Sequence, residues 1–338
     1  MYMAMGVECM SGYFLIIDGG TSNTRVTLLS EQQTVLDVEK RAVGVGQTAI
    51  DGHNMALKSA IRDAIDTILE RNHITDKEIH RCIAYGMLTS NVGLVEIPHC
   101  VAPVGPGELH HAMQQHIFPD VASFPIDFIP GVRNTKGEVD LDNFSSMDMM
   151  RGEETEALGL WSLLSLKEAC VVILPGSHNK FVSMDDHGNI LGCMTSMSGE
   201  FLDVLIHHSI LADAVQRRFL SEEDYDLSFL LAGYREAARD GLGRAAFSGR
   251  ILRTIGAFPS EKVSNYLLGV VLQSDAAALK TFCGPTTPLY VAGKPPLQKA
   301  IADLFREAGF TAVHESAKSV HANIGIAGAL KIALYMDK

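Results

Sequence analysis

The chain has 338 residues, 47% of them hydrophobic and 20% charged, which provides for a large core and excludes an intrinsically disordered protein. Its length suits two domains rather than one. The 40 acidic residues outnumber the 28 basic ones, and the net charge of −12 argues against a nucleic-acid partner. No apolar run approaches a membrane span, and the six cysteines lack zinc-site spacing, so we expect a reduced cytoplasmic protein without a membrane partner.

The first half of the chain alternates between strand-like and helix-like segments, which favours an α/β fold. The expected strands are short runs of branched and aromatic residues that end at turn residues, over 13–18, 26–29, 34–39, 81–85 and 126–129. The first three of them are expected to form an antiparallel meander. The expected helices carry apolar residues at helical spacing or acids at their start, over 54–71 and 151–166.

The second half begins with a nearly unbroken apolar run, typical of a buried strand. Strands are expected over 170–174, 181–184, 189–195, 288–291 and 310–314. Helices are expected over 201–211, 224–239, 297–305 and 322–335, with a further long helix from 260. Ser260 is expected to cap that long helix, and Pro295 and Pro296 are expected in the first turn of the next one. The last helix is dense in alanine and glycine, so its backbone could approach a neighbour closely.

The two halves share one architecture. In each, a strand enters a turn of glycine and hydroxyl residues, and two further strands follow, with the turn glycines at positions 20 and 176. An internal repeat of this size predicts two similar lobes, each a mixed sheet with helices. We expect the first lobe over 1–168, rejoined by the C-terminal helix 319–338, and the second lobe over 169–318.

The segment Asp18–Arg25 is the turn of the first lobe, and it reads Asp-Gly-Gly-Thr-Ser-Asn-Thr-Arg. Adjacent glycines allow close approach of the backbone to a ligand, and backbone amides with hydroxyl and amide side chains can face an anion. Asp18 can hold a metal ion or its waters. Together these features predict a site for nucleotide phosphates with Mg²⁺, whereas an ordinary hairpin turn needs only two such residues.

The corresponding turn of the second lobe is Pro175–Lys180, which reads Pro-Gly-Ser-His-Asn-Lys. A Walker A loop is missing from the sequence, because Gly293-Lys294 is not preceded by the required glycine and is followed by proline. A Rossmann glycine motif is missing too, because both glycine turns lead into strands rather than helices. Two phosphate hairpins, one in each lobe, are the organisation of the sugar kinase, Hsp70 and actin superfamily. This predicts a two-lobed, ribonuclease H-like fold with the active site in the cleft between the lobes.

The segment Met150–Thr155 reads Met-Arg-Gly-Glu-Glu-Thr and starts a helix. Phosphoryl transfer needs a group that orients or deprotonates the attacking hydroxyl and positive charge near the phosphates. Adjacent acids can raise one another's pKa, which suits a base. The alternative is a helix start with stabilising acids, which is common in proteins.

These motifs resemble those of the 2-keto-3-deoxygalactonate kinases (2-dehydro-3-deoxygalactonokinases). The resemblance covers nearly the whole chain, through the segments Asp18–Arg25, Gly86–Gly93, Met150–Thr155, Pro175–Lys180 and Ser198–Glu200. It implies an ATP- and Mg²⁺-dependent kinase that phosphorylates the 6-hydroxyl of 2-keto-3-deoxygalactonate in sugar-acid and galactonate catabolism. The helix start is also similar to the corresponding segment of exopolyphosphatases, in which a glutamate of the pair is catalytic.

The resemblance implies a role for each motif residue. Nucleotide phosphates are contacted by Gly19, Gly20, Thr21, Ser22 and Asn23 from one hairpin and by Gly176, Ser177 and His178 from the other. Asp18 organises Mg²⁺. Lys180 neutralises phosphate charge or is an ordinary surface lysine. Gly293 allows close approach to the adenine.

On the substrate side, Glu153 or Glu154 accepts the proton of the sugar hydroxyl. Arg151 binds the substrate carboxylate or pairs with Asp148 or Glu154. The remaining candidates for sugar contacts are Ser90, Asn91, Ser198 and Glu200.

Three positions depart from the family pattern, which usually has tryptophan at Gly19, threonine at Ser198 and small hydroxylated residues in place of Lys294-Pro295-Pro296. The last departure leaves the nucleotide preference open. Two other functions remain as alternatives, namely a phosphohydrolase of exopolyphosphatase type and a nucleotide-binding regulator without turnover. The oligomeric state is open, with a homodimer among the expectations.

Overall fold

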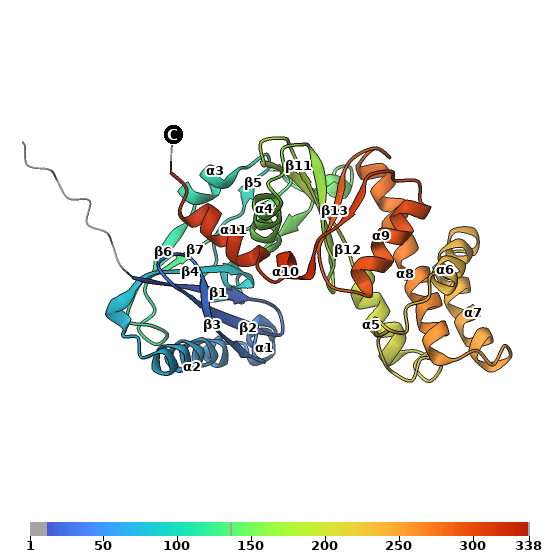
Figure 1. The fold of residues 1–338 in the computed structure, drawn as a ribbon, viewed down its shortest axis with the longest axis horizontal. Helices are drawn as coiled ribbons and strands as arrows, with labels where there is room; N and C mark the ends of the chain where they lie inside the picture. The colour runs from blue at the N-terminus through green and yellow to red at the C-terminus, as the bar shows by residue number, and fades with distance from the viewer. Residues whose placement is uncertain (1–11, 136, 337–338) are drawn as a thin grey trace, which may run out of the picture. The chain divides into compact units, whose positions relative to one another are not determined.

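The computed structural model describes residues 12–135 and 137–336. The chain divides into two compact units, with unit 1 made of Met1–Arg133, Met150–Ser162 and Gly325–Lys338, and unit 2 of Asn134–Met149 and Leu163–Ile324 (Figure 1). Segment 134–149, which the sequence placed in the first lobe, lies in unit 2, where the side chains of Asn134 and Asp148 bond to the backbone of β12. Within the described residues, no helix has the length and apolar content that crossing a membrane requires.

Unit 1 is built on a six-stranded sheet in the order β3-β2-β1-β4-β7-β6. Its strands are β1 (Tyr13–Gly19), β2 (Thr24–Leu29), β3 (Val35–Arg41), β4 (Ile79–Gly86), β6 (Gln114–His116) and β7 (Ile126–Phe128). The first three form the predicted antiparallel meander, while β4 runs parallel to β1 and β7 parallel to β4. A smaller sheet joins β5 (Cys100–Val101), β8 (Val132–Arg133) and β9 (Met149–Met150).

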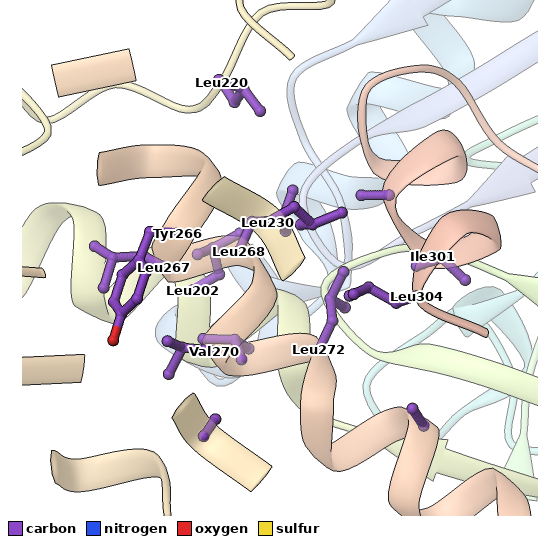
Figure 2. Packing of buried hydrophobic residues seen from close by; sticks show 14 of the residues in the cluster. Leu202, Leu220, Leu230, Tyr266, Leu267, Leu268, Val270, Leu272, Ile301 and Leu304 are labelled. Atoms are coloured by element: carbon purple, nitrogen blue, oxygen red, sulfur yellow. The ribbon is translucent and has the colours of Figure 1, made fainter. Parts of the chain in front are cut away.

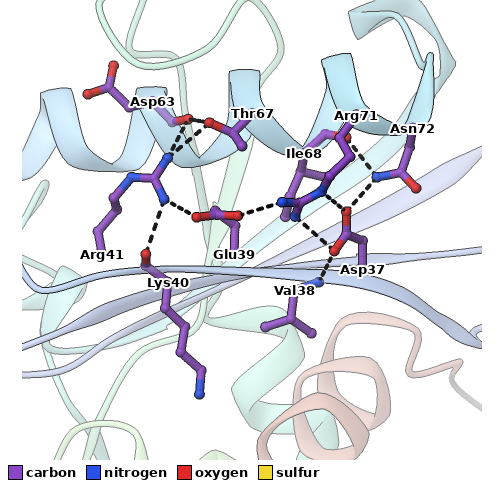
Figure 3. Close-up of polar contacts among 10 residues, drawn as sticks. All are labelled: Asp37, Val38, Glu39, Lys40, Arg41, Asp63, Thr67, Ile68, Arg71 and Asn72. Atoms are coloured by element: carbon purple, nitrogen blue, oxygen red, sulfur yellow. Dashed lines mark hydrogen bonds and ion pairs between the residues drawn. The ribbon is translucent and has the colours of Figure 1, made fainter.

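Unit 1 contains α1 (Val45–Asp51), α2 (Met55–Asn72), α3 (Pro106–His111) and most of α4 (Glu153–Leu164), with short 3-10 turns at Asp76–Glu78 and Met87–Thr89. A third 3-10 turn, Phe144–Ser146, lies in the segment 134–149 of unit 2. The predicted apolar face of α2 is buried against the sheet. Polar contacts also connect α2 to β3 (Figure 3). Arg71 donates to both carboxylate oxygens of Asp37 at 2.7 and 2.9 Å, and Arg41 donates to Thr67 at 2.9 Å.

Unit 2 repeats this topology, as predicted, with a five-stranded sheet in the order β12-β11-β10-β13-β14. The strands are β10 (Cys170–Leu174), β11 (Asn179–Met184), β12 (Ile190–Ser196), β13 (Leu289–Val291) and β14 (Val313–Glu315). As in unit 1, an antiparallel meander of three strands is extended by parallel strands.

The helices of unit 2 are α5 (Ser198–His208), α6 (Leu227–Asp240), α7 (Leu242–Thr254), α8 (Ser260–Phe282), α9 (Leu297–Glu307) and α10 (Lys318–His321). Apolar residues of α5, α6, α8 and α9 form one buried cluster (Figure 2). Helices α6 and α8 touch through their backbones, because a Cβ atom at Gly233 would lie 1.9 Å from the Tyr266 carbonyl oxygen and one at Gly269 the same distance from that of Leu230.

Several predicted helix boundaries are wrong. Ser260 is the first residue of α8, and Pro259 takes the capping position without a side-chain hydrogen bond. Pro296 is the N-cap residue of α9, so Pro295 and Pro296 precede its first turn. The C-terminal helix expected over 319–338 is two helices, α10 and α11 (Ile324–Ala333).

Helix α11 completes unit 1. A Cβ atom at Gly328 would lie 1.8 Å from the Thr155 carbonyl oxygen, so α11 rests directly on the backbone of α4. Arg81 of β4 donates a hydrogen bond to the carbonyl of Ala333. The close approach predicted from the alanine- and glycine-rich sequence is therefore confirmed, and it depends on glycine at position 328.

Candidate functional site

The first hairpin exposes unused backbone donors. The Gly20 amide closes the turn by donating to the Asn23 carbonyl at 2.9 Å. No hydrogen bond from the amides of Thr21 and Ser22 occurs within residues 12–135 and 137–336, and both side chains are exposed. Free amides at a glycine turn are a site for an anion.

The carbonyl groups of this hairpin accept hydrogen bonds from the start of α1. The amides of Val45 and Gly46 donate to the carbonyls of Gly20 and Thr21 at 3.1 and 2.8 Å. A Cβ atom at Gly44 would lie 2.4 Å from the Gly20 oxygen, so the chain must be glycine there to come this close. The turn is therefore fixed with its carbonyls paired and its amides free.

Asp18 is the next-to-last residue of β1, beside the hairpin. Its carboxylate lies 3.7 Å from the Arg25 guanidinium, and the side chain is 31% exposed. Burial raises the pKa of Asp18, and Arg25 and the Tyr85 hydroxyl partly offset the shift. No cluster of three metal-ligating side chains lies in the described parts of the chain, so a Mg²⁺ ion here would take its other ligands from phosphate and water, as Mg²⁺ commonly does.

Close backbone contacts at Gly19, Gly86 and Gly152 bring the start of α4 next to the ends of β1 and β4. Gly86 ends β4 with φ +79° and a Cβ atom there would lie 2.6 Å from the Gly19 oxygen. Gly152 precedes α4 with φ +112°, and its Cβ position lies 3.2 Å from the Gly86 Cα atom. Positive φ and such close backbone contacts both favour glycine. The ends of β1 and β4 and the start of α4 therefore meet in unit 1.

The two adjacent glutamates at the start of α4 differ in environment. Glu153 is partly exposed, and its carboxylate accepts the Arg151 amide at 3.1 Å. Glu154 is fully buried, and its carboxylate accepts the Gly152 amide at 2.8 Å and the Thr155 hydroxyl at 3.1 Å. Burial and the charge of Glu153 raise the pKa of Glu154 to about 8.

The raised pKa of Glu154 predicts a pH-dependent cost to stability. Because the folded protein holds this proton between its ordinary pKa of 4.5 and about 8 while the unfolded chain releases it, stability falls as pH rises through that window. We expect Glu154→Gln to raise Tm by several degrees at pH 8.5 and by much less at pH 5. Thermal unfolding of both proteins at the two pH values measures this, and a difference that is equal at both would contradict it.

Arg151 is already partly engaged. Its guanidinium donates to the Thr89 hydroxyl at 2.8 Å and the Ile97 carbonyl at 2.9 Å, and lies 3.4 Å from Nδ1 of His99. Among the described residues of unit 1 no carboxylate lies within ion-pair distance of it, so the expected pairing with Glu154 is wrong. Asp148 instead accepts hydrogen bonds from the backbone and hydroxyl of Thr195 within unit 2.

The two candidate sugar-binding residues after β4 also differ. Ser90 is only 6% exposed and donates its hydroxyl to the Met87 carbonyl at 2.7 Å, so its hydrogen atom is committed to the turn. Asn91 is exposed, and no side-chain hydrogen bond of Asn91 is present in the described residues. Asn91 is therefore the better placed of the two for a ligand.

A buried polar network supports the second hairpin. The Asn179 side chain accepts the Gly176 amide at 3.1 Å and donates to Asp275 of α8 at 2.7 Å. Ser198, at the start of α5, donates to the other oxygen of Asp275 at 2.5 Å. Asp275 is 1% exposed, and burial raises its pKa. The predicted contact of Ser198 with the sugar does not fit, because its hydroxyl is buried and donates to Asp275.

The outer part of the same hairpin rests on α5. The Glu200 amide donates to the Ser177 carbonyl at 2.8 Å, and the Glu200 carboxylate lies 2.9 Å from Nε2 of His178. A Cβ atom at Gly199 would lie 2.1 Å from the Gly176 oxygen. His178 and Glu200 are about half exposed, so this pair remains open to a ligand.

Lys180 is not a surface lysine. It is 4% exposed, and its ammonium donates to the Met149 carbonyl at 2.8 Å and to the Thr195 hydroxyl, with Asp148 at 3.8 Å. Two of the three N–H donors are used by Met149 and Thr195, and the ammonium is buried beside Asp148, so the predicted contact with phosphate does not fit. Lys180 instead fastens segment 134–149 to the sheet of unit 2.

Gly293 follows β13 beside the second hairpin. It has φ +106°, and a Cβ atom there would lie 3.4 Å from the side chain of Pro175. The neighbouring Lys294 is exposed and Pro296 is buried. Its positive φ favours glycine at this position, and a contact with the adenine remains a prediction.

Sequence comparison decides the family. The family described as 2-keto-3-deoxy-galactonokinase matches residues 18–328. The chain belongs to this family. A protein of Escherichia coli (strain K12) named 2-dehydro-3-deoxygalactonokinase is 23% identical over 81% of this chain and 82% of its own length. A Rhizobium meliloti (strain 1021) protein, named as a probable 2-dehydro-3-deoxygalactonokinase, is 28% identical over 61% of this chain, and the match spans 60% of that relative.

The fold agrees with the family. The crystal structure of a Sinorhizobium meliloti protein, provisionally named a 2-dehydro-3-deoxygalactonokinase, has a TM-score of 0.74 at 22% identity and covers 94% of this chain and 98% of that one. This confirms the predicted α/β fold of the sugar kinase and actin type. Against the family pattern, glycine at position 19 is explained by Leu88, whose Cγ atom would lie 2.3 Å from a Cβ atom there.

Sequence reasoning missed three residues of the candidate site. Tyr85 and Glu156 face Asp18 from β4 and α4, and burial together with the charge of Asp18 raises the pKa of Glu156 to about 8. Asp275 lies in the middle of a long helix. The one available signal was an acid among apolar residues, which indicates a buried partner but not which one.

Proposed function

We propose that the chain transfers the γ-phosphoryl group of ATP, with Mg²⁺, to the 6-hydroxyl of 2-keto-3-deoxygalactonate. The observation that carries the proposal is the meeting, within unit 1, of a hairpin with free amides and the Arg151–Thr155 helix start. Family membership over residues 18–328 supports the substrate class.

On this proposal the nucleotide end is held by backbone and side-chain donors. Thr21, Ser22 and Asn23 contact the phosphates from the first hairpin, and Ser177 and His178 do so from the second. Asp18 holds Mg²⁺, which neutralises charge on the phosphates when bound. Gly293 lies along the adenine.

Glu153 is the proposed base, because it is partly exposed while Glu154 is fully buried with a raised pKa. Glu153 takes the proton from the substrate hydroxyl, and the hydroxyl oxygen forms a bond to the γ-phosphorus. The bond between that phosphorus and the bridging oxygen breaks, and ADP leaves with the electron pair. Arg151 binds the substrate carboxylate with the donors that Thr89 and Ile97 leave free.

A coupled assay of ADP release over a panel of 2-keto-3-deoxy sugar acids tests the proposal. We expect turnover with 2-keto-3-deoxygalactonate, dependence on ATP and Mg²⁺, and little ADP release without a sugar acid. ATP binding by a folded protein that phosphorylates no panel member would overturn the substrate assignment. Phosphate release from ATP or polyphosphate without a sugar acid would favour a phosphohydrolase, and tight ATP binding without any turnover would favour a regulator.

A further inference from the structure

The small sheet of unit 1 brings a second arginine and a histidine beside Arg151. Strands β5 and β8 pair in parallel, with Val101 opposite Arg133. His99 directly precedes β5. A Cβ atom at Gly131, which precedes β8, would lie 2.9 Å from the His99 ring and 2.7 Å from Cγ of Arg151, so both side chains cover the same glycine.

Two polar groups at this place lack partners. Nε of Arg133 is buried without a hydrogen bond, and its guanidinium forms no hydrogen bond or ion pair with any residue that the structure describes. Nε2 of His99 is likewise buried and unpaired. Because arginine only donates, Nδ1 of His99 must accept from Arg151, which puts the ring proton on the unpaired Nε2.

The charges are equally unbalanced. Burial and the positive charges of Arg151 and Arg133 lower the pKa of His99 to about 4, so the ring is neutral near pH 7. Two guanidinium groups therefore face one neutral imidazole in a chain of net charge −12, with no carboxylate of the described residues of unit 1 paired to either. Buried donors and charges without partners are costly, and an anion would offset that cost.

We propose that Arg133 and His99 form, with Arg151, a binding subsite for the carboxylate of a 2-oxo acid. The forked guanidinium of Arg133 matches the two oxygens of a planar carboxylate, and Nε2–H of His99 supplies one further donor. This assignment rests on the proposed function in naming a sugar acid as the ligand. The subsite selects acids over neutral sugars, and it acts on binding rather than on the transferred phosphoryl group.

The test compares Arg133→Gln with the matched control Arg62→Gln, which removes an exposed arginine of α2 in the same unit. We expect Arg133→Gln to raise KM for 2-keto-3-deoxygalactonate roughly 10- to 100-fold, with kcat within about 3-fold. For the analogue with a hydroxymethyl group in place of the carboxylate, kcat/KM should not change. His99→Phe should raise KM by a smaller factor. Arg133→Lys should restore part of the affinity for the sugar acid, and it provides the test if Arg133→Gln fails to fold.

Calorimetric titration of the wild-type protein and Arg133→Gln with the sugar acid, without nucleotide, separates this inference from the proposed function. Binding that disappears in Arg133→Gln supports the subsite even if no sugar acid is phosphorylated. An unchanged KM and an unchanged binding constant in Arg133→Gln would overturn it. Competition by inorganic phosphate that is stronger than competition by 2-oxobutanoate would overturn the carboxylate assignment.

Discussion

Replacing Glu153 by glutamine is expected to lower kcat by about 1,000-fold, within the range that general bases contribute. Glutamine keeps the size of the side chain but cannot accept the proton from the sugar hydroxyl. It can still accept the Arg151 amide, so the start of α4 should stay in place. Discontinuous or coupled assays of ADP release give kcat. Equilibrium titration with a fluorescent ATP analogue should show that the variant binds the analogue with a nearly unchanged Kd.

Two comparisons make this result specific. Glu70→Gln removes an exposed acid of α2 in the same unit and should keep wild-type kinetics. Glu154→Gln should lose far less activity than Glu153→Gln, because Glu154 is buried and accepts hydrogen bonds only from its neighbours. A larger loss in Glu154→Gln than in Glu153→Gln would reverse the assignment of the base, and near-wild-type rates in both would remove the acid pair from the mechanism.

Asp18→Asn is expected to lower kcat/KM for MgATP by roughly 100-fold or more, since the amide lacks the charge that holds the metal ion. The stability of the folded protein should not fall in this variant. Burial raises the pKa of Asp18, so the ionised carboxylate lowers the stability of the wild-type protein near neutral pH. We expect an equal or higher Tm in the variant at pH 7.5.

The Mg²⁺ dependence of ATP binding gives a readout apart from turnover. In the wild-type protein, ATP should bind more tightly with Mg²⁺ than with EDTA, and Asp18→Asn should lose most of that difference. A variant that keeps the wild-type Mg²⁺ dependence, whatever its turnover, would place the metal ion away from Asp18. A large drop in Tm would instead mean that Asp18 acts through the packing of β1.

The sheets could be predicted from sequence because their strands are short apolar runs that end in turn residues. The repeated meander and its glycine turns were sufficient to predict two units of the same topology. What the sequence did not contain was the break between α10 and α11 and the assignment of 134–149 to unit 2. The assignment of 134–149 depends on contacts such as the hydrogen bond between Asn134 and Cys193, which lie 59 positions apart.

The candidate site was predictable where function needs unusual backbone, as at the hairpins and at Gly152. It was not predictable where a side chain's role depends on its partner. Lys180 has the sequence context of a phosphate ligand but is buried on Met149 and Thr195. Asp275 contacts Asn179 across 96 positions, and no local pattern marks that pairing.

Helix α11 has a consequence for the order in which the protein can assemble on the ribosome. Unit 1 takes in the first 133 residues, yet Gly325 and Gly328 must reach Tyr85 and Thr155 before it is complete. All of unit 2 is synthesised earlier than that helix. The nascent unit 1 therefore waits with one face of β4 and α4 uncovered while unit 2 acquires all its residues, the reverse of the usual N-terminal-first sequence of domain folding.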